Sequence, residues 1–262
     1  MVPMTDLTRP VALVTGASSG IGADLARELA RDGHDLVLTA RSLAPMQALA
    51  AELESSGANS VVIPADLSKP GTAAVLAGDI EARGLTIDVL INNAGLGALG
   101  RFGGMDPQRI SEMLQVNVVA LTELTRLLLP GMVARRRGKV MLVASTAGFQ
   151  PGPRMAVYFA TKAYVLSLGE ALFYELRNTG VTVTTLCPGA TATNFFRVAG
   201  AKDLAWRPGM SAQEVARIGY HSLKAGRRVV ITGAINRILA VAGRYAPHWL
   251  TLPATGALMS RR

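Results

Sequence analysis

Residues 157–164, VYFATKAY, place Tyr158 and Lys162 four positions apart. Residues at this spacing share one face of a helix, with Cβ atoms about 5–6 Å apart. Free tyrosine titrates near ~10 and lysine near ~10.4, so neither suits proton transfer at neutral pH unless its surroundings shift its pKa. A nearby cation favours tyrosinate and makes the phenol a better acid. The pair is either a proton donor with its tuning cation, or a packed ring beside a surface lysine.

A glycine-rich segment, TGASSGIG at residues 15–22, follows a short apolar run and precedes a helix-length segment. In such a turn, backbone N–H groups and the positive end of the helix face a phosphate, and glycines allow close approach. Gly16, Gly20 and Gly22 have the spacing Gly-x-x-x-Gly-x-Gly, not Gly-x-Gly-x-x-Gly. The segment predicts a phosphate-binding turn, with a purely structural turn as the alternative.

The second predicted strand ends in Ala40 and Arg41. An acid about 20 residues after the glycine turn binds the ribose 2′-hydroxyl of NAD, whereas an arginine nearby accommodates the 2′-phosphate of NADP. No acid occupies either position, and a guanidinium binds phosphate in bidentate geometry. We therefore expect NADP(H) rather than NAD(H), unless Arg41 only begins a solvated helix.

Short apolar runs alternate with helix-length segments along most of the chain. Continuous apolar runs are typical of strands buried on both faces, so the pattern predicts an α/β fold in which helices cover both sides of a parallel sheet. Ligands of such sheets lie beyond the carboxyl ends of the strands. The fourth helix should end at Pro130. We expect strands at 10–15, 35–40, 60–65, 87–92, 139–145, 181–187 and 228–232, and helices at 20–32, 42–56, 70–83, 106–129, 155–178 and 211–225.

The chain has 262 residues, of which half are hydrophobic, and this suits one large domain with a sizeable core. Cys187 is the only cysteine, so an intramolecular disulfide is excluded and an oxidising compartment is not required. The uncharged stretch 245–260 is broken by Pro247 and Pro253 and is shorter than the roughly 18–20 residues that span a bilayer. No targeting segment is evident, and we expect a soluble, cytoplasmic protein.

The net charge of +9 is concentrated near the C-terminus: residues 200–262 hold ten Lys/Arg and only two acids, Asp203 and Glu214. This asymmetry indicates an acidic partner, either an anionic substrate or a membrane surface, or else an ordinary solvated basic face. Nucleic acid is not expected, because the segment lacks interleaved aromatics and any recognisable binding module.

Seven motifs together resemble the short-chain dehydrogenase/reductase family, in family order and over nearly the whole chain. The resemblance implies a single Rossmann-type domain over 1–262, a doubly wound parallel sheet of about seven strands in the order 3-2-1-4-5-6-7. The motifs are TGASSGIG (15–22), ADL (65–67), NNAG (92–95), Asn117, Ser145, YFATK (158–162) and PGATAT (188–193).

The resemblance implies a catalytic role for Asn117, Ser145, Tyr158 and Lys162. Ser145 matches the serine that hydrogen-bonds the substrate carbonyl, and Tyr158 matches the proton donor to that oxygen. Lys162 matches the residue that binds the nicotinamide ribose and lowers the tyrosine pKa. Asn117 matches the asparagine that orders a water in a proton relay.

The resemblance also implies an NADP(H) site and no metal. Asn194 and Cys187 depart from family preferences, but neither departure removes a catalytic group. We expect the cofactor to contact Gly16, Ser18, Ser19, Gly20, Ile21, Gly22, Arg41, Asp66, Leu67, Asn93, Ala94, Gly95, Tyr158, Lys162, Pro188, Gly189, Thr191 and Thr193.

Two C-terminal segments bear on the substrate. Residues 190–211 should form a lid, whose apolar side chains suit a bulky hydrophobic substrate or simple packing; they are Phe195, Phe196, Leu204, Trp206 and Met210. The basic extension 234–262 resembles that of long-chain 3-oxoacyl reductases and 17β-hydroxysteroid dehydrogenases. It could dock on a membrane, extend the substrate pocket or change an oligomer interface.

The leading hypothesis is an NADPH-dependent reductase that transfers hydride to a hydrophobic ketone or 3-oxoacyl substrate, and oxidises the secondary alcohol in reverse. The resemblance implies a homodimer or homotetramer. One alternative is a catalytically idle NADP-binding regulator, although the complete catalytic set argues against it. Another is a scaffold at a membrane surface that uses the basic C-terminal region for peripheral contact.

Overall fold

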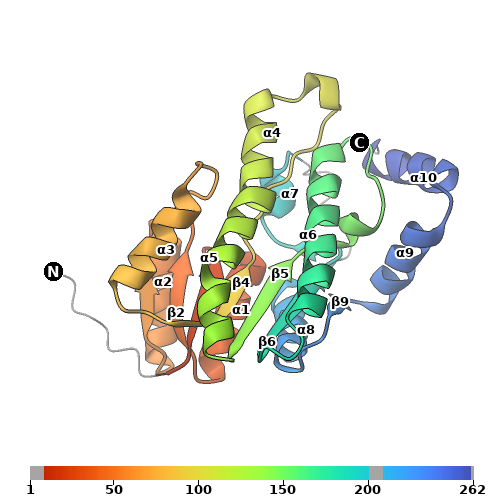
Figure 1. Ribbon diagram of the computed structural model, residues 1–262. Helices are drawn as coiled ribbons and strands as arrows, with labels where there is room; N and C mark the ends of the chain where they lie inside the picture. Colours follow the sequence, from red (N-terminus) through yellow and green to blue (C-terminus); the bar gives the residue numbers. More distant parts are fainter. Residues whose placement is uncertain (1–8, 201–208, 261–262) are drawn as a thin grey trace.

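Seven apolar segments form one parallel sheet in the computed structural model, which describes residues 9–200 and 209–260. The order across the sheet is β3-β2-β1-β4-β5-β6-β9 (Figure 1). Numbered among themselves, these strands follow the predicted order 3-2-1-4-5-6-7, so the α/β doubly wound fold is confirmed. The strands are Val11–Thr15 (β1), Asp35–Thr39 (β2), Ser60–Val62 (β3), Ile87–Asn92 (β4), Gly138–Val143 (β5), Val181–Cys187 (β6) and Val229–Ile231 (β9).

Helices cover both faces of the sheet because alternate side chains of each strand point to opposite sides. Val11 and Leu13 join one buried cluster, with α3 (Thr72–Ala82), α5 (Leu121–Ala134) and α6 (Ala156–Glu175). Ala12 and Val14 join the other, with α1 (Gly20–Arg31), α2 (Leu43–Ser55) and α8 (Ala212–Lys224). Figure 1 shows α5 and α6 in front of the central strands.

The long helix predicted over 106–129 is divided in three: α4 (Pro107–Leu114), a π-helical turn η2 (Gln115–Ala120) and α5. The predicted end at Pro130 is wrong, because α5 continues through it to Ala134. Pro130 is exposed and removes a single hydrogen bond near the end of the helix, whereas Met132, one half-turn later, is completely buried. Burial of Met132 keeps the last turn on the sheet.

The helical run Pro107–Ala134 is, among the described residues, the one long and apolar enough in composition to cross a membrane. Its apolar side chains pack inside the protein: Met113, Leu121 and Leu124 are buried in the core between the sheet and the neighbouring helices. The run also carries Asn117, which is fully buried at the π-helical turn. We therefore assign it to the core of the domain.

Small elements lie near the carboxyl ends of the strands. The predicted lid contains a two-stranded parallel ladder of β7 (Thr191–Ala192) with β8 (Met210–Ser211), and the short helix α7 (Phe195–Val198). Leu204 and Trp206 lie outside the described residues, as does the side chain of Phe196. The 3₁₀ turns are η1 (Phe102–Gly104) and η3 (Thr146–Phe149).

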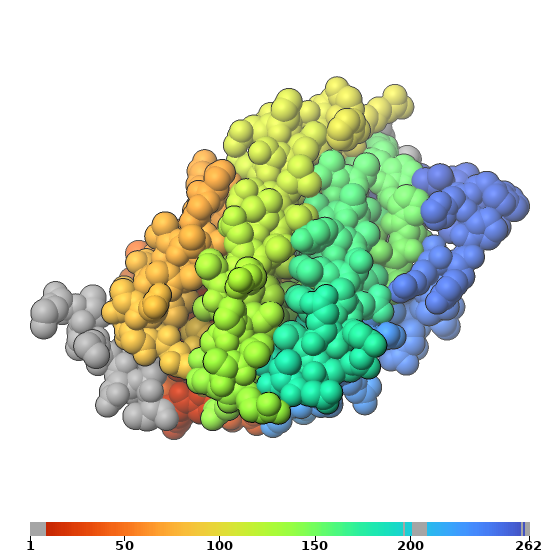
Figure 2. All heavy atoms as spheres, in the orientation of Figure 1, coloured from red at the N-terminus to blue at the C-terminus, as the bar shows by residue number. Residues whose placement is uncertain are grey.

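The C-terminal segment forms two helices, α9 (Ala234–Tyr245) and α10 (His248–Ser260). Both lie at the edge of the molecule beyond β9, beside α6 (Figure 1). The space-filling view in Figure 2 shows this segment, in blue, reaching outward from one side of the body.

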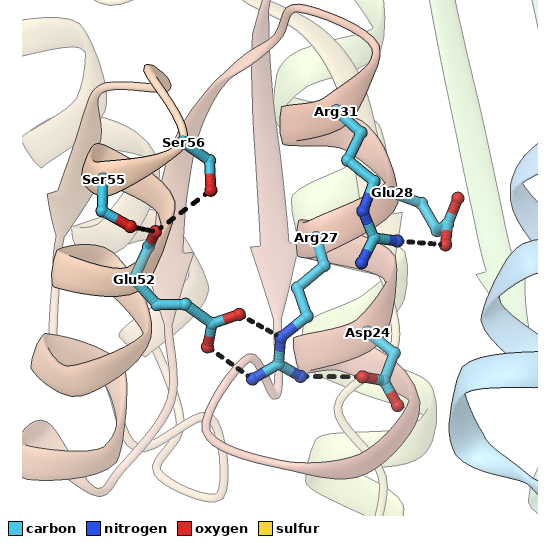
Figure 3. Close-up of polar contacts among 7 residues, drawn as sticks. All are labelled: Asp24, Arg27, Glu28, Arg31, Glu52, Ser55 and Ser56. Atoms are coloured by element: carbon cyan, nitrogen blue, oxygen red, sulfur yellow. Dashed lines mark hydrogen bonds and ion pairs between the residues drawn. The ribbon is translucent and has the colours of Figure 1, made fainter.

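A network of ion pairs joins α1 to α2 and so holds the helix that follows the glycine turn (Figure 3). The Arg27 guanidinium donates from Nε and Nη2 to the two carboxylate oxygens of Glu52, at 2.7 and 2.8 Å, and from Nη1 to Asp24 at 2.7 Å. The hydrogen bond from Arg27 lowers the pKa of Glu52. Arg31 instead pairs with Glu28 within α1.

Replacing Arg27 with Met should lower the free energy of unfolding by about 1 kcal/mol, because the bidentate pair is partly exposed. Urea denaturation measures this change. Arg31→Met is the matched control: its pair lies within one helix and should contribute less than about 0.5 kcal/mol. Equal changes in the free energy of unfolding would show that the ion pair between helices contributes no more than the pair within one helix.

Candidate active site

A cavity of about 490 Å³ opens at the carboxyl ends of β1, β4, β5 and β6, where the sequence predicts a ligand. All the predicted site residues line it except Gly22 and Asn117. Gly22 lies beneath the glycine turn, and Asn117 lies behind the cavity wall in η2. These two residues do not line the cavity but support the residues that do.

The glycine turn is held open by a hydrogen-bonded frame from β4. Gly16 has φ +66°, a conformation that favours glycine, and a Cβ at Gly22 would collide with Gly16 O and with Asn93 Nδ2. Asn93 Nδ2 donates to Thr15 O at 2.9 Å, while Thr15 Oγ1 accepts from Asn93 N and Ala94 N, each at 2.9 Å. Asn93 thus supports the turn. Its partner Thr15 begins the TGASSGIG motif but is not among the expected cofactor contacts.

The N-terminus of α1 suits an anionic group. The Ser19 side chain, at the N-cap, makes no capping hydrogen bond, and Gly20 with φ +58° keeps the backbone close to the cavity. Free N–H groups and the helix dipole at such an end favour a phosphate. With the space left by Gly16 and Gly22, these residues fit a dinucleotide diphosphate.

Two charged residues lie at the far rim of the cavity. Arg41 is exposed after β2 and lines the rim with Ser42. Asp66 accepts hydrogen bonds from Ser68 N at 3.1 Å and Ser68 Oγ at 2.7 Å. Burial opposes ionisation of Asp66, but the Ser68 hydrogen bonds, with help from Arg41, leave its pKa below the usual value. This end therefore presents one cation and one stable carboxylate.

Tyr158 and Ser145 meet at the opposite end of the cavity. Ser145 follows β5 and begins η3, where its Oγ accepts from Ala147 N at 3.1 Å and donates to Pro188 O at 3.4 Å. The Tyr158 ring lies against Phe195, with centroids 5.1 Å apart, and against Phe159 at 6.2 Å. The tyrosine hydroxyl and the serine hydroxyl therefore face one apolar compartment.

Lys162 lies one helical turn after Tyr158 and is 4% exposed. Its Nζ donates to Val143 O at 2.8 Å and lies 5.8 Å from the Tyr158 ring centroid. Burial lowers the pKa of Lys162 to about 8. Gly95 leaves the amine accessible, since a Cβ there would lie 3.4 Å from Nζ. The surface-lysine alternative is therefore wrong.

The pKa of Tyr158 differs from expectation. The resemblance implies a lowered value, yet burial raises the pKa of Tyr158 to about 12, and its hydrogen bond with Ser145 only partly opposes this. Desolvation disfavours the charged phenolate, and the Lys162 amine is directed to Val143 O instead of the phenol. The protein alone thus keeps this phenol protonated.

Asn117 joins two parts of the site. Its Oδ1 accepts from Leu96 N at 2.8 Å, and its Nδ2 donates to Leu96 O at 2.8 Å and to Thr161 Oγ1 at 3.0 Å. Thr161 Oγ1 in turn donates to Tyr158 O at 2.7 Å. Asn117 therefore fixes the segment after β4 against the helix that carries Tyr158 and Lys162.

The apolar compartment includes Phe195, which the sequence analysis places in the lid, and several residues that sequence reasoning missed. Phe195 of the lid packs directly on Gly97, where a Cβ would collide with its ring. Asn236 of α9 fills the space beside Gly189 and donates to Thr232 O at 2.7 Å. No spacing signal points to Asn236, because α9 and α10 reach the site only through tertiary packing. The missed lining residues include Gln150, Met155, Phe159, Val198, Asn236, Leu239, Ala240 and Met259.

The fold and the site define an α/β protein with a dinucleotide-type cleft, and comparison with known proteins gives its family. A family model described as short chain dehydrogenase matches residues 10–203. The ketoacyl reductase HetN of a Nostoc species is 36% identical over 186 residues, covering 71% of this chain and 65% of that protein. The chain belongs to the short-chain dehydrogenase family of oxidoreductases.

Solved structures agree over almost the whole chain. A short-chain dehydrogenase from Sphingobium yanoikuyae in complex with NADPH is 34% identical, with a TM-score of 0.81 over 97% of this chain and 96% of that one. The bulky-bulky ketone specific alcohol dehydrogenase from Comamonas testosteroni is 31% identical, with a TM-score of 0.77 over 97% and 95%. A Burkholderia phymatum relative in complex with NAD is 25% identical, with a TM-score of 0.84 over 93% and 95%.

Lys162→Met should remove a pH-dependent part of the stability. The pKa of Lys162 is about 8 in the folded chain against an ordinary value of 10.5, so between these values the unfolded chain binds the extra proton. Stability of the native chain should therefore rise across this window relative to Lys162→Met, by on the order of 3 kcal/mol. Urea unfolding at several pH values measures the difference.

The control is Lys69→Met, at an exposed position, which should keep the pH slope of the native chain. If the free energy of unfolding of Lys162→Met and of the native chain rose equally with pH across this window, the buried amine would not be the source of the pH dependence.

Proposed function

We propose that the chain is an NADPH-dependent reductase of hydrophobic ketones or 3-oxoacyl compounds, which oxidises the corresponding alcohols in reverse. The observation that carries the proposal is the position of Tyr158, Ser145 and Lys162. All three border one cavity that is apolar on the lid side and has a phosphate-compatible turn at its other end. This arrangement needs no metal ligand set, and the described residues contain no such cluster.

In this proposal the dinucleotide lies between the glycine turn and Lys162. Gly16, Gly20 and the N-terminus of α1 would hold the diphosphate, and Asp66 would contact the adenine end. Lys162 would bind ribose hydroxyls, and the segment from Pro188 to Thr193 would hold the nicotinamide carboxamide. When bound, the reduced cofactor supplies the hydride for the substrate carbonyl carbon.

Ser145 and Tyr158 act on the carbonyl oxygen. The Ser145 hydroxyl donates a hydrogen bond to that oxygen, and the Tyr158 hydroxyl gives it the proton that completes the alcohol. A phenol whose pKa is raised to about 12 is fully protonated at neutral pH, as a donor must be. Lys162, with a pKa of about 8, remains largely cationic at neutral pH and stabilises the phenolate that proton transfer leaves.

The substrate class follows from the lining of the lid side. Apolar side chains line this part of the cavity, among them Phe159, Phe195, Val198, Leu239 and Met259. An apolar wall with a few convergent polar groups selects a hydrophobic body that carries one polar centre. The names of the Comamonas and Nostoc relatives, a bulky ketone dehydrogenase and a ketoacyl reductase, support the same class.

We also propose that the chain is cytoplasmic. As the family resemblance implies, we propose that it forms a homodimer or homotetramer and that 1–262 is a single domain. Exposed apolar side chains along α4, η2 and α5, such as Leu114, Val119 and Leu127, offer a surface for a second copy. The idle-regulator alternative gains no support, because the four predicted catalytic residues are present and assembled.

Tyr158→Phe should reduce NADPH-dependent turnover of hydrophobic ketones by about 10²–10⁴-fold or more, because the proton donor is lost. NADPH binding, followed by cofactor fluorescence, should remain nearly unchanged. Tyr164→Phe is the control: its hydroxyl contacts Thr122 on the exposed side of the same helix, and it should retain turnover. Retained activity in Tyr158→Phe would refute the acid assignment. No turnover of any ketone by the native chain, despite tight NADPH binding, would favour the regulator.

Arg41→Asp should shift the preference from NADPH toward NADH by about ten- to hundred-fold, because a charged hydrogen bond to the 2′-phosphate is replaced by repulsion. The ratio of kcat/KM for the two cofactors measures this shift. Arg83→Asp, at an exposed position away from the cavity, should leave the ratio unchanged. An unchanged ratio in Arg41→Asp would mean that another residue holds the phosphate.

A further inference from the structure

The outer surface of α9 and α10 exposes an unusual amount of apolar side chain. Tyr245 is 78% exposed, Ile235 74% and Trp249 73%, although such residues are normally covered. Exposed apolar patches of this kind mark interaction sites with proteins or membranes. Between 235 and 252 the exposed large apolar residues are Ile235, Ile238, Leu239, Val241, Tyr245, Trp249, Leu250 and Leu252.

The folded chain uses only a narrow stripe of α9. Asn236 fills the space beside Gly189, Ala240 is buried, and Gly243 leaves room for the Gln150 side chain. These three positions are spaced i, i+4 and i+7, so they form one line along the helix. Most of the other apolar residues of α9 are exposed. Figure 2 shows the C-terminal segment projecting from one side of the body.

The C-terminal segment that carries this surface has charges of one sign. After Glu214 the chain contains no acidic residue, while it contains eight Lys/Arg. Arg237 and Arg244 of α9 are exposed among the apolar residues, and Arg244 also approaches Glu170 at 3.5 Å. Two copies of this surface placed face to face would bring arginines together without acids from this segment to pair with them. An anionic surface would pair with them instead.

The residue types also match a lipid interface. Tyr and Trp place an apolar ring in the acyl boundary and a polar atom in the headgroup layer, and arginine extends its charge toward the phosphates. Tyr245, Trp249 and Arg237 provide these groups within one short segment. A basic, apolar helical surface of this kind lies in the plane of an anionic bilayer.

We propose that the outer surface of α9 and α10 docks on an anionic lipid bilayer and places the apolar end of the cavity at the lipid surface. Leu239 connects the two features, because it is 61% exposed and also lines the cavity. A hydrophobic substrate then enters the cavity from the lipid. The docking is independent of the proposed reaction. The entry of substrate from the lipid rests on the proposed function.

Vesicle flotation of the full chain tests the docking. The protein should float with phosphatidylcholine vesicles that contain phosphatidylglycerol and not with phosphatidylcholine alone, and added salt should weaken the binding. Ile238→Gln with Trp249→Gln should weaken binding by about ten-fold or more. Arg237→Gln should weaken it by about five-fold. Val75→Gln, an apolar position 64% exposed on α3, is the matched control and should bind like the native chain.

Three outcomes overturn the proposal. The first is no flotation with anionic vesicles, and the second is an equal loss of vesicle binding in Val75→Gln. The third is loss of self-association in Ile238→Gln/Trp249→Gln, measured by sedimentation velocity, which would assign the surface to a second copy. Turnover of a water-soluble ketone by the double variant at the native rate shows that its fold is intact, and its circular dichroism spectrum shows this independently of activity. If the native chain binds vesicles but reduces no ketone, the proposed reaction is refuted and the proposed docking is supported.

Discussion

The site depends on the burial of an amine. Lys162 is almost completely removed from water, and its Nζ donates a hydrogen bond to the carbonyl of Val143 at the end of β5. Desolvation makes an ammonium group there costly, which is why its pKa falls toward neutrality. The same dry surroundings raise the pKa of Tyr158, so the phenol keeps its proton until the charge distribution of the site changes. Burial therefore sets the protonation state of both side chains.

Holding these groups in place requires a rigid frame around the carboxyl edge of the sheet. Asn117 bonds the segment after β4 to α6 from within a π-helical turn, and such turns often occur at functional sites. Thr15 and Asn93 hold the glycine turn in place in the same way, through hydrogen bonds. In both cases an amide or hydroxyl side chain is hydrogen-bonded to the backbone. Such groups position the reactive residues and do not compete with them for the ligand.

The C-terminal helices both complete the cavity and present an exposed surface. Ala240, Leu239 and Met259 complete the cavity, while their neighbours leave a basic apolar surface exposed. A helix that packs through one narrow line of small residues, Ala240 and Gly243 among them, has most of its circumference free. The wall of the substrate compartment and the proposed docking surface are therefore two sides of the same helix.

Local patterns in the sequence determined the strands, the helices and most of the cavity. Continuous apolar runs specify buried parallel strands, and motifs at their carboxyl ends must converge because all seven strands point the same way. The end of α5, the pKa of Tyr158 and the contribution of α9 and α10 were decided only by the tertiary structure. The first depends on how deeply Met132 is buried, the second on desolvation, and the third on packing between Asn236 and Gly189, 47 positions apart in sequence. Each is a property of long-range packing, which the spacing of neighbouring residues does not encode.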